Sequence, residues 1–273
     1  MTSHALIPLS DGRSIPQLGL GVYKIPDADA AECVRVAIEA GYRHIDTAAL
    51  YENERGVGEG IRTSGIPRDE VFVTTKVWND DHGFDETLRA FDASLDRLGL
   101  DAVDLYLIHW PIPSRDRYVE TYRALERIRE EGRARSIGVS NFAIAHLDRL
   151  RAETDVAPVV NQVELHPLLP QADLRAYHAA HGIVTEAWSP LARGRLLDDP
   201  ALARIAEKHG VAPAQVVIRW HLQLGNVVIP KSVTPARIRA NIDVLGFELD
   251  ADDLAAIAAL ESGLRTGRDP SLD

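Results

Sequence analysis

Eight short runs of β-branched and apolar residues alternate with helical segments along this chain, and this alternation restricts the fold more than any other feature. The helical segments have apolar residues at spacings of three and four, a pattern that predicts parallel strands connected by crossover helices. The strand candidates are residues 18–22, 44–46, 71–76, 103–109, 136–140, 159–162, 183–187 and 227–230. Because no linker or charge block interrupts the eight units, we expect an α/β fold with a single (β/α)8 TIM barrel domain over residues 1–273.

Further elements are expected around the eight units. The pattern of residues 5–16 is typical of an N-terminal β-hairpin. An extra helix at residues 213–224 precedes the eighth strand, a second at 251–260 follows the eighth unit, and a tail at 261–273 ends the chain. A chain of 273 residues suits this architecture, because such barrels typically contain about 250 residues.

A doubly wound dinucleotide-binding fold is the natural competitor. That fold should open with G-x-G-x-x-G between its first strand and first helix. Gly19-Leu20-Gly21 ends in the wrong residues, and the glycines of residues 56–60 fall inside a predicted helix. The barrel is therefore the better interpretation.

Charge, apolar runs and cysteine content narrow the class of protein. The net charge of -11 disfavours nucleic acid or an anionic membrane as a partner. No run of roughly 18 apolar residues is present, and the first ten residues lack the pattern of a signal peptide. The lone Cys33 cannot form an intramolecular disulfide, which fits a reducing compartment. We expect a cytoplasmic protein with a small-molecule ligand, and we expect it to be a monomer.

Ionisable side chains stand where three consecutive predicted strands end. Asp46, Lys76 and His109 end the second, third and fourth strands, and Tyr51 follows in the loop after Asp46. Each of them alone could simply mark the point where a strand meets water. Together they favour a site, because the chemistry of such barrels sits at the carboxyl ends of the strands.

These four residue types suit the reduction of a carbonyl group by hydride transfer, in which the oxygen must receive a proton. A free phenol, with a pKa of about 10, is too weak an acid to supply that proton well. The Lys76 ammonium would make the Tyr51 phenol more acidic, and the Asp46 carboxylate would keep that ammonium charged and oriented. A neutral His109 would orient the carbonyl oxygen.

At these residues the sequence resembles the aldo-keto reductase family. Three long motifs carry the resemblance in the family's order, and they span nearly the whole chain: residues 41–48 (GYRHIDTA) with Tyr51, Asn53-Glu54 and Gly58, residues 135–142 (RSIGVSNF), and residues 229–232 (IPKS) with Arg237 and Asn241. The resemblance implies that Asp46, Tyr51, Lys76 and His109 are the catalytic residues. It also implies reduction of aldehydes or ketones to alcohols, with Tyr51 as the general acid.

The end of the eighth strand indicates a site for a phosphate group. Thr234 suits the N-cap of a helix and Pro235 its first position, and a helix start attracts anions. Lys231 and Arg237 add two cations. Charge-assisted hydrogen bonds contribute about 1.5 to 3 kcal/mol each, so the pair would favour NADP(H) over NAD(H) by about a hundredfold or more.

The resemblance implies the rest of the NADPH site. Ser140, Asn141 and Gln162 would hold the nicotinamide carboxamide, and Trp188 would stack on the ring. Ser189 and Leu191 would line the pyrophosphate, and Ser232 and Asn241 would complete the phosphate and adenine contacts. Trp188 stands where many animal members have tyrosine, and the loop at residues 192–200 is short. Both features point to the bacterial branch that is similar to 2,5-diketo-D-gluconic acid reductases.

The resemblance also implies that Val22, Trp78 and Trp110 wall the substrate pocket, and aromatic walls favour small apolar or flat carbonyl compounds. The tail should reach the same pocket. We hypothesise that Arg265 or Arg268 helps to bind acidic or hydroxylated substrates, with a solvated tail as the alternative.

Other interpretations remain at this point. Glu164 with His166, and His178 with His181, have spacings that suit a metal, but neither pair has a third ligand at a sensible distance, so we expect no metal. A lyase could use Lys76 as a Schiff-base nucleophile, although pairing with Asp46 would keep that lysine protonated. A cofactor-sensing binding protein with vestigial turnover is a third possibility.

Overall fold

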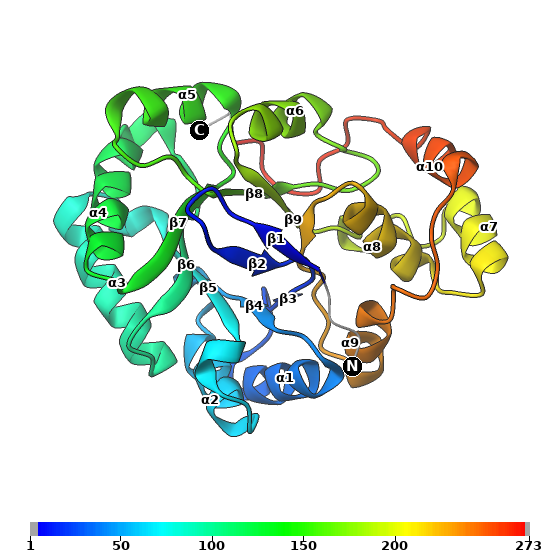
Figure 1. The fold of residues 1–273 in the computed structure, drawn as a ribbon, viewed down its shortest axis with the longest axis horizontal. Coiled ribbons are helices and arrows are strands. Elements are labelled where there is room, and N and C mark those ends of the chain that lie inside the picture. Colours follow the sequence, from blue (N-terminus) through cyan, green and yellow to red (C-terminus); the bar gives the residue numbers. More distant parts are fainter. Residues whose placement is uncertain (1–4, 271–273) are drawn as a thin grey trace.

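A computed structural model describes residues 5–270 of the chain, so residues 1–4 and 271–273 of the expected domain and tail lie outside it. Eight parallel strands form one sheet in the order β10-β9-β8-β7-β6-β5-β4-β3, and helices surround it (Figure 1). The strands are β3 (Leu20–Gly21), β4 (His44–Asp46), β5 (Phe72–Val77), β6 (Val103–Ile108), β7 (Ala134–Ser140), β8 (Val160–Glu164), β9 (Val184–Trp188) and β10 (Val227–Val228). The predicted α/β fold is confirmed.

The two edge strands meet and close the sheet into a barrel. Parallel bridges join Leu18 to Val228 and Gly21 to Lys231. The Gly19 N–H donates to the Val228 carbonyl at 2.9 Å. A Cβ atom on Gly19 would stand 2.6 Å from the His44 ring, so the seam needs glycine there. Gly19-Leu20-Gly21 therefore belongs to the seam that closes the barrel and does not begin a dinucleotide-binding motif.

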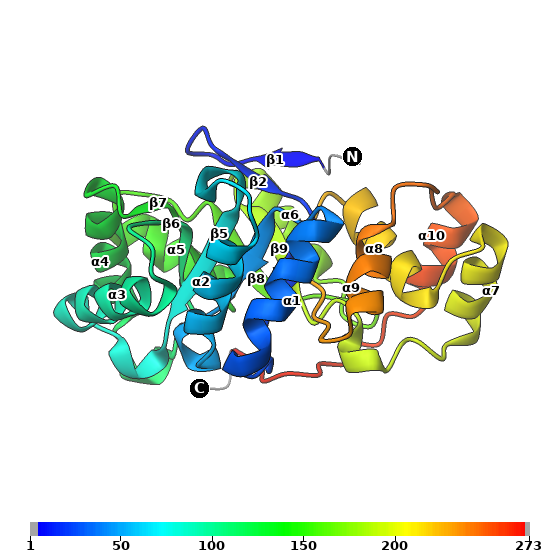
Figure 2. The ribbon, with the colours of Figure 1, turned by 90° about the horizontal axis from the view of Figure 1, so that it is seen from below.

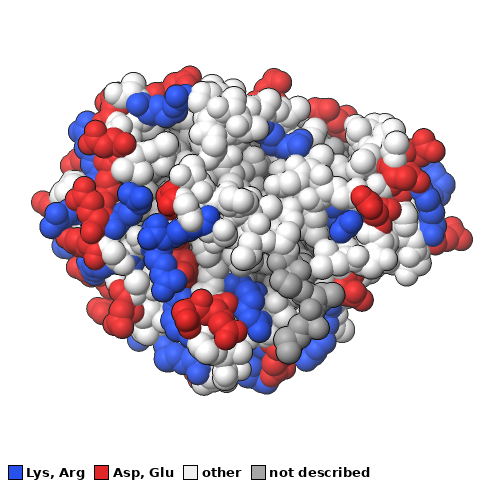
Figure 3. All heavy atoms as spheres, in the orientation of Figure 1, with Lys and Arg blue, Asp and Glu red and all other residues white. Residues whose placement is uncertain are grey.

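The expected hairpin closes one end of the barrel. Strands β1 (Leu6–Pro8) and β2 (Ser14–Pro16) pair antiparallel and lie across the barrel (Figures 1 and 2). Buried Leu9 and Ile15 pack on Leu105, Leu107 and other residues of the strands. On this face, acidic and basic side chains are intermixed and lie mostly toward the rim (Figure 3). The opposite end of the barrel carries the C-terminal tail and is not covered by the hairpin, so a functional site can lie there.

The helices between the strands bury their apolar stripes against the barrel. In α3, Phe91, Leu95 and Leu98 are buried, and the helix ends at Gly99 in a left-handed conformation, as expected. The helices are α1 (Asp27–Ala40), α2 (Glu54–Thr63), α3 (Phe84–Leu98), α4 (Tyr118–Glu130), α5 (Ile144–Glu153), α6 (Ala172–Ala180), α7 (Pro200–His209), α8 (Pro213–Gln223), α9 (Pro235–Ile242) and α10 (Ala251–Ala258). The two extra helices of the prediction are α8 and α10. Among residues 5–270, no helix combines the length and apolar character needed to cross a bilayer.

Candidate active site

A cavity of about 370 Å³ is lined in part by the C-terminal tail. The tail crosses the end of the barrel opposite the hairpin (Figure 2). The rest of the cavity lining comes from the residues that follow most of the strands, so strand exits do converge there, as the sequence predicts. The lining residues that the sequence had singled out are Asp46, Tyr51, Trp78, His109, Trp110, Ser140, Asn141, Gln162, Trp188, Ser189, Lys231 and Arg268. Further lining residues, which the sequence did not indicate, include Tyr23, Leu50, Asn79, Arg193, Ile229 and Gly267.

The loop after β4 carries Tyr51 into this cavity. Tyr51 ends a short 3-10 helix (Ala49–Tyr51), and buried Asn53 fixes that loop. The Asn53 amide donates to the carbonyls of Val22 and Ile25, each at 2.9 Å, and its oxygen accepts a hydrogen bond from Thr47. The loops after β3 and β4 are therefore tied together, which sets the place of the phenol.

Lys76 and Asp46 form a fully buried ion pair beside Tyr51. The Lys76 Nζ donates to Asp46 Oδ1 at 2.7 Å and to the Thr47 carbonyl at 2.8 Å. It lies 5.1 Å from the centroid of the Tyr51 ring. Burial raises the pKa of Asp46, and the Lys76 ammonium opposes that rise. The pairing expected from the sequence is present.

His109 also lies beside the Tyr51 phenol. Its ring centroid is 5.6 Å from that of Tyr51 and 5.1 Å from that of Trp78. Burial and the nearby Lys76 ammonium lower the pKa of His109 well below 6.5, so the ring is neutral at physiological pH, as expected.

The expected acidification of Tyr51 is wrong in direction. Burial raises the pKa of the Tyr51 phenol well above its ordinary value of 10, and the negative charge of Asp46 adds to the rise. From the sequence, Asp46 was expected only to keep the Lys76 ammonium charged and oriented; the burial of the phenol and the direct effect of the Asp46 charge on it were left out. Tyr51 therefore keeps its proton throughout the neutral range.

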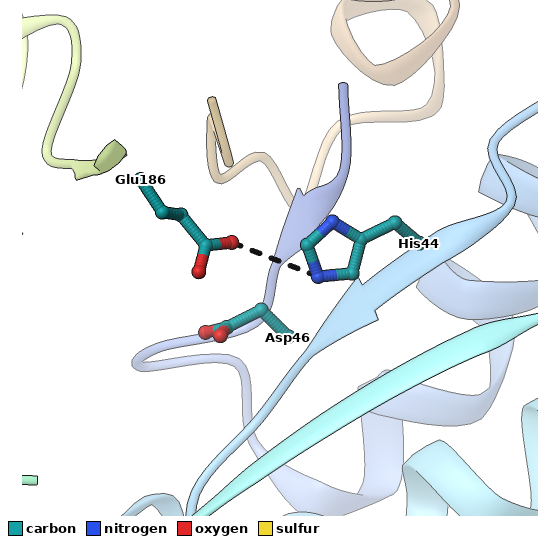
Figure 4. A group of neighbouring side chains, drawn as sticks. All are labelled: His44, Asp46 and Glu186. Atoms are coloured by element: carbon teal, nitrogen blue, oxygen red, sulfur yellow. Dashed lines mark ion pairs between the residues drawn. The ribbon is translucent and has the colours of Figure 1, made fainter. Parts of the chain in front are cut away.

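A second buried carboxyl group lies beside the ion pair, and it was not identified from the sequence as part of the site. Glu186 in β9 and His44 in β4 point toward each other next to Asp46, and Glu186 Oε1 is 3.6 Å from His44 Nε2 (Figure 4). The Gln162 amide bridges the two acids, donating to Asp46 Oδ2 at 2.7 Å and to Glu186 Oε2 at 3.0 Å. Burial and the charge of Asp46 raise the pKa of Glu186 to about 8. A charged residue within a buried strand, two positions before the exit residue Trp188, was the signal for it.

His44, Asp46 and Glu186 are also the one group of three possible metal ligands that residues 5–270 bring together. The Lys76 ammonium and the Gln162 amide already hydrogen-bond their carboxylate oxygens. The group is a hydrogen-bonded network of charged and neutral side chains.

Polar residues from β7, β8 and β9 meet at one wall of the cavity. Asn141 and Ser189 adopt left-handed conformations at two strand exits, with φ of 64° and 48°. The Trp188 Nε1 donates to Asn141 Oδ1 at 2.9 Å, and the Asn141 amide donates to the His109 carbonyl. Ser140 donates to the Gln162 carbonyl. The residues expected at the nicotinamide are thus close together and mutually fixed.

The segment after β10 leads from the cavity into α9. Lys231 lines the cavity, Pro235 is the first residue of α9 and Thr234 is its N-cap residue, as expected. The Thr234 N–H donates to the hydroxyl of buried Ser232 at 3.1 Å. Arg237 is exposed on the first turn of α9, and Asn241 is buried on its last turn. Leu191, two residues beyond Ser189 in the segment after β9, is partly buried.

The aromatic walls differ in one detail from the expectation. Trp78 and Trp110 line the cavity, whereas Val22 is fully buried in the core and its neighbour Tyr23 takes the place in the lining. Tyr23 lies with its ring centroid 5.0 Å from that of Tyr51.

The histidine pairs with metal-like spacing have other partners. His178 contacts the Asn161 amide at 3.0 Å and the Thr185 hydroxyl at 2.8 Å. His166 donates to Glu164, whose carboxylate also accepts hydrogen bonds from the C-terminal tail. Both pairs are parts of the packed structure.

Comparison with known proteins assigns the family. Residues 17–262 match the model of the Aldo/keto reductase family. An aldo-keto reductase of Mycolicibacterium smegmatis is 58% identical over 264 residues, 97% of this chain and 96% of that protein. Methylglyoxal reductase DkgA of Yersinia pestis is 52% identical over 274 residues, 100% of this chain and 98% of that protein. The crystal structure of a Gox0644 mutant in complex with NADPH is 51% identical, with a TM-score of 0.95 over 99% of this chain and 98% of that one. On these grounds, this chain belongs to the aldo/keto reductase family.

Proposed function

We propose that this protein reduces small aldehydes and ketones to alcohols with NADPH, and that Tyr51 is the proton donor. The observation that carries the proposal is that Tyr51, neutral His109 and Asp46 line one cavity of about 370 Å³, while the fully buried Lys76 pairs with Asp46. The methylglyoxal reductase among its relatives makes α-dicarbonyl compounds the first substrates to test.

The residues around the cavity fit a dinucleotide phosphate. Lys231 at the end of β10 and Arg237 on the first turn of α9 supply positive charge on a chain whose net charge is -11. The free N–H groups at a helix start favour an anion at the same place. The Trp188 ring, fixed by its hydrogen bond to Asn141, offers a flat face at the cavity wall. Ser140, Asn141 and Gln162 would bind the carboxamide, Ser189 and Leu191 the pyrophosphate, and Ser232 and Asn241 the adenine ribose phosphate and adenine.

The reaction requires one hydride and one proton, and bound NADPH supplies the hydride to the carbonyl carbon. As that carbon accepts the hydride, the π electrons of the C=O bond move to oxygen, which then takes the proton of the Tyr51 hydroxyl. An alkoxide is a far stronger base than a phenolate, so a phenol with a raised pKa can still donate to it. The raised pKa ensures that Tyr51 carries its proton when the substrate arrives.

Lys76, Asp46 and His109, which surround Tyr51, each have a separate role in the reaction. The Lys76 ammonium stabilises the phenolate as it forms, and Asp46 keeps the ammonium in place. Neutral His109 donates a hydrogen bond to the carbonyl oxygen and orients it. Tyr51 is partly exposed, so water can return its proton after turnover.

The buried pairing of Lys76 argues against a Schiff-base lyase, because a protonated, fully buried lysine cannot attack a carbonyl. Asp46, Tyr51 and His109 beside that lysine also argue against a binding protein with vestigial turnover.

The test is NADPH oxidation, followed by absorbance, with methylglyoxal, a simple aldehyde and a ketone, each repeated with NADH. We expect turnover with the dicarbonyl and a preference for NADPH. Tight binding of NADPH without oxidation by any carbonyl would reject the proposal in favour of a binding protein.

A further inference from the structure

The C-terminal tail crosses the end of the barrel that holds the cavity (Figure 2). It follows α10 and is tied first by the Ser262 N–H, which donates to the Leu168 carbonyl at 3.2 Å. Two of its residues, Gly267 and Arg268, line the cavity, whereas Arg265 pairs with Asp269 at 3.6 Å. The tail therefore forms part of the wall of the cavity, so the shape of that wall depends on the contacts that hold the tail to the barrel.

One buried carboxylate makes several of the polar contacts that hold this wall. Glu164, the last residue of β8, is 1% exposed. Its Oε1 accepts hydrogen bonds from both the N–H and the hydroxyl of Thr266, each at 2.5 Å. Its Oε2 accepts the Gly267 N–H at 3.1 Å, and His166 Nε2 donates to Oε1 at 3.1 Å.

Hydrogen-bond donors from the tail stabilise the buried negative charge of Glu164. A carboxylate removed from water is costly unless hydrogen bonds replace its hydration. The hydrogen bonds from His166, Thr266 and Gly267 outweigh burial and lower the pKa of Glu164 to about 2. Undocking the tail would remove two of these three donor residues and leave His166, so the charge of Glu164 favours the docked state over the whole neutral range.

Gly267 fills the space between this carboxylate and Trp188. A Cβ atom at Gly267 would overlap the six-membered ring of Trp188 and would stand 3.1 Å from Glu164 Oε2. The tail backbone thus packs directly on the Trp188 ring, whose Nε1 is fixed on Asn141. Glu164, the tail and Trp188 form one continuous wall.

We propose that Glu164 is a positioning residue that fastens residues 265–268 against Trp188, and that this contact sets how tightly the cavity holds its carbonyl substrate. The inference rests on the proposed reductase function for its kinetic part. Its structural part, the docking of the tail by Glu164, can be measured without any turnover.

Thr266, which is partly buried, offers a matched pair of variants. Thr266→Val keeps the shape and removes the hydroxyl donor, whereas Thr266→Ser keeps the donor. Loss of one hydrogen bond to a charged group weakens docking by about tenfold or more. We expect Thr266→Val to raise KM for methylglyoxal by a similar factor, with kcat and NADPH affinity changed by less than about twofold, and Thr266→Ser to restore KM.

Hydrogen exchange of the Thr266 and Gly267 amides separates the two parts of the inference. In the protein without substrate, exchange should be slow in the wild type and in Thr266→Ser, and faster in Thr266→Val. Glu164→Gln should speed the same amides. If exchange does not change in Thr266→Val and Glu164→Gln, the carboxylate does not hold the tail. If exchange rises in Thr266→Val while KM stays the same, or if kcat and NADPH affinity fall as much as KM rises, the tail is not a wall for the substrate.

Discussion

Replacing Glu186 by glutamine should change how the stability of the barrel depends on pH. The Glu186 side chain is fully buried, and its Oε1 has no hydrogen-bond partner among residues 5–270. Burial and the charge of Asp46 raise its pKa to about 8 from an ordinary value of 4.5. A glutamine side chain at this position would keep the shape and can still accept the Gln162 hydrogen bond, but it has no proton to lose.

The size of the effect follows from the difference between the pKa of about 8 in the folded protein and the ordinary value of 4.5. Each pKa unit corresponds to about 1.4 kcal/mol, so the whole difference contributes about 5 kcal/mol to the free energy of unfolding. Between the two pKa values the unfolded chain has released the proton and the folded chain still holds it. The stability associated with Glu186 is therefore fully present below about pH 4.5 and is lost as the pH rises toward 8.

The assay is denaturant unfolding of the wild type and Glu186→Gln at about pH 5.5 and pH 7.5. Relative to the variant, the wild type should lose about 3 kcal/mol of unfolding free energy between these two values. Glu207→Gln, on the exposed face of α7, is the control and should follow the wild type. A difference between Glu186→Gln and wild type that is the same at both pH values would refute a neutral buried carboxyl group.

Three further changes test other parts of the structure. Asp46→Asn leaves the buried Lys76 ammonium without its carboxylate, so the unfolding free energy should fall by about 3 to 5 kcal/mol and NADPH oxidation should become much slower; unchanged stability would contradict the buried pair. Arg237→Ala should lower the ratio of kcat/KM for NADPH to that for NADH by about tenfold or more, with NADH kinetics unchanged, because one charge-assisted hydrogen bond is lost. Gly58→Ala should destabilise the protein by about 3 kcal/mol in thermal or chemical unfolding, because the new methyl group would overlap the Leu98 carbonyl; wild-type stability would show that α2 can move away from α3.

The sequence predicts the architecture well because each barrel unit carries its own pattern. The strand with His44 to Asp46 has the predicted bounds, and the others differ by a few residues at their ends. The greatest shortening occurs at β3 and β10, where Gly19, Gly21 and Pro230 limit regular pairing at the seam.

The candidate site is predicted less completely, because much of it depends on groups from distant strands. Asp46, Lys76 and His109 lie at or next to the carboxyl ends of the neighbouring strands β4, β5 and β6, so their meeting follows from topology. The raised pKa of Tyr51 and the sharing of Gln162 between two acids require three-dimensional burial and distances. For the same reason, spacing could suggest a metal at Glu164 but could not indicate that the tail, about a hundred residues away, supplies its partners.

The most direct test of the proposed chemistry compares Tyr51→Phe with wild type in two measurements, NADPH binding by fluorescence titration and turnover of methylglyoxal. Tyr177→Phe, which removes a partly exposed phenol bound to Asp148, serves as the control. We expect Tyr51→Phe to bind NADPH as the wild type does and to lose turnover by a factor of about 100 to 10,000. Turnover that stays at the wild-type rate in Tyr51→Phe would contradict the assignment of the proton donor.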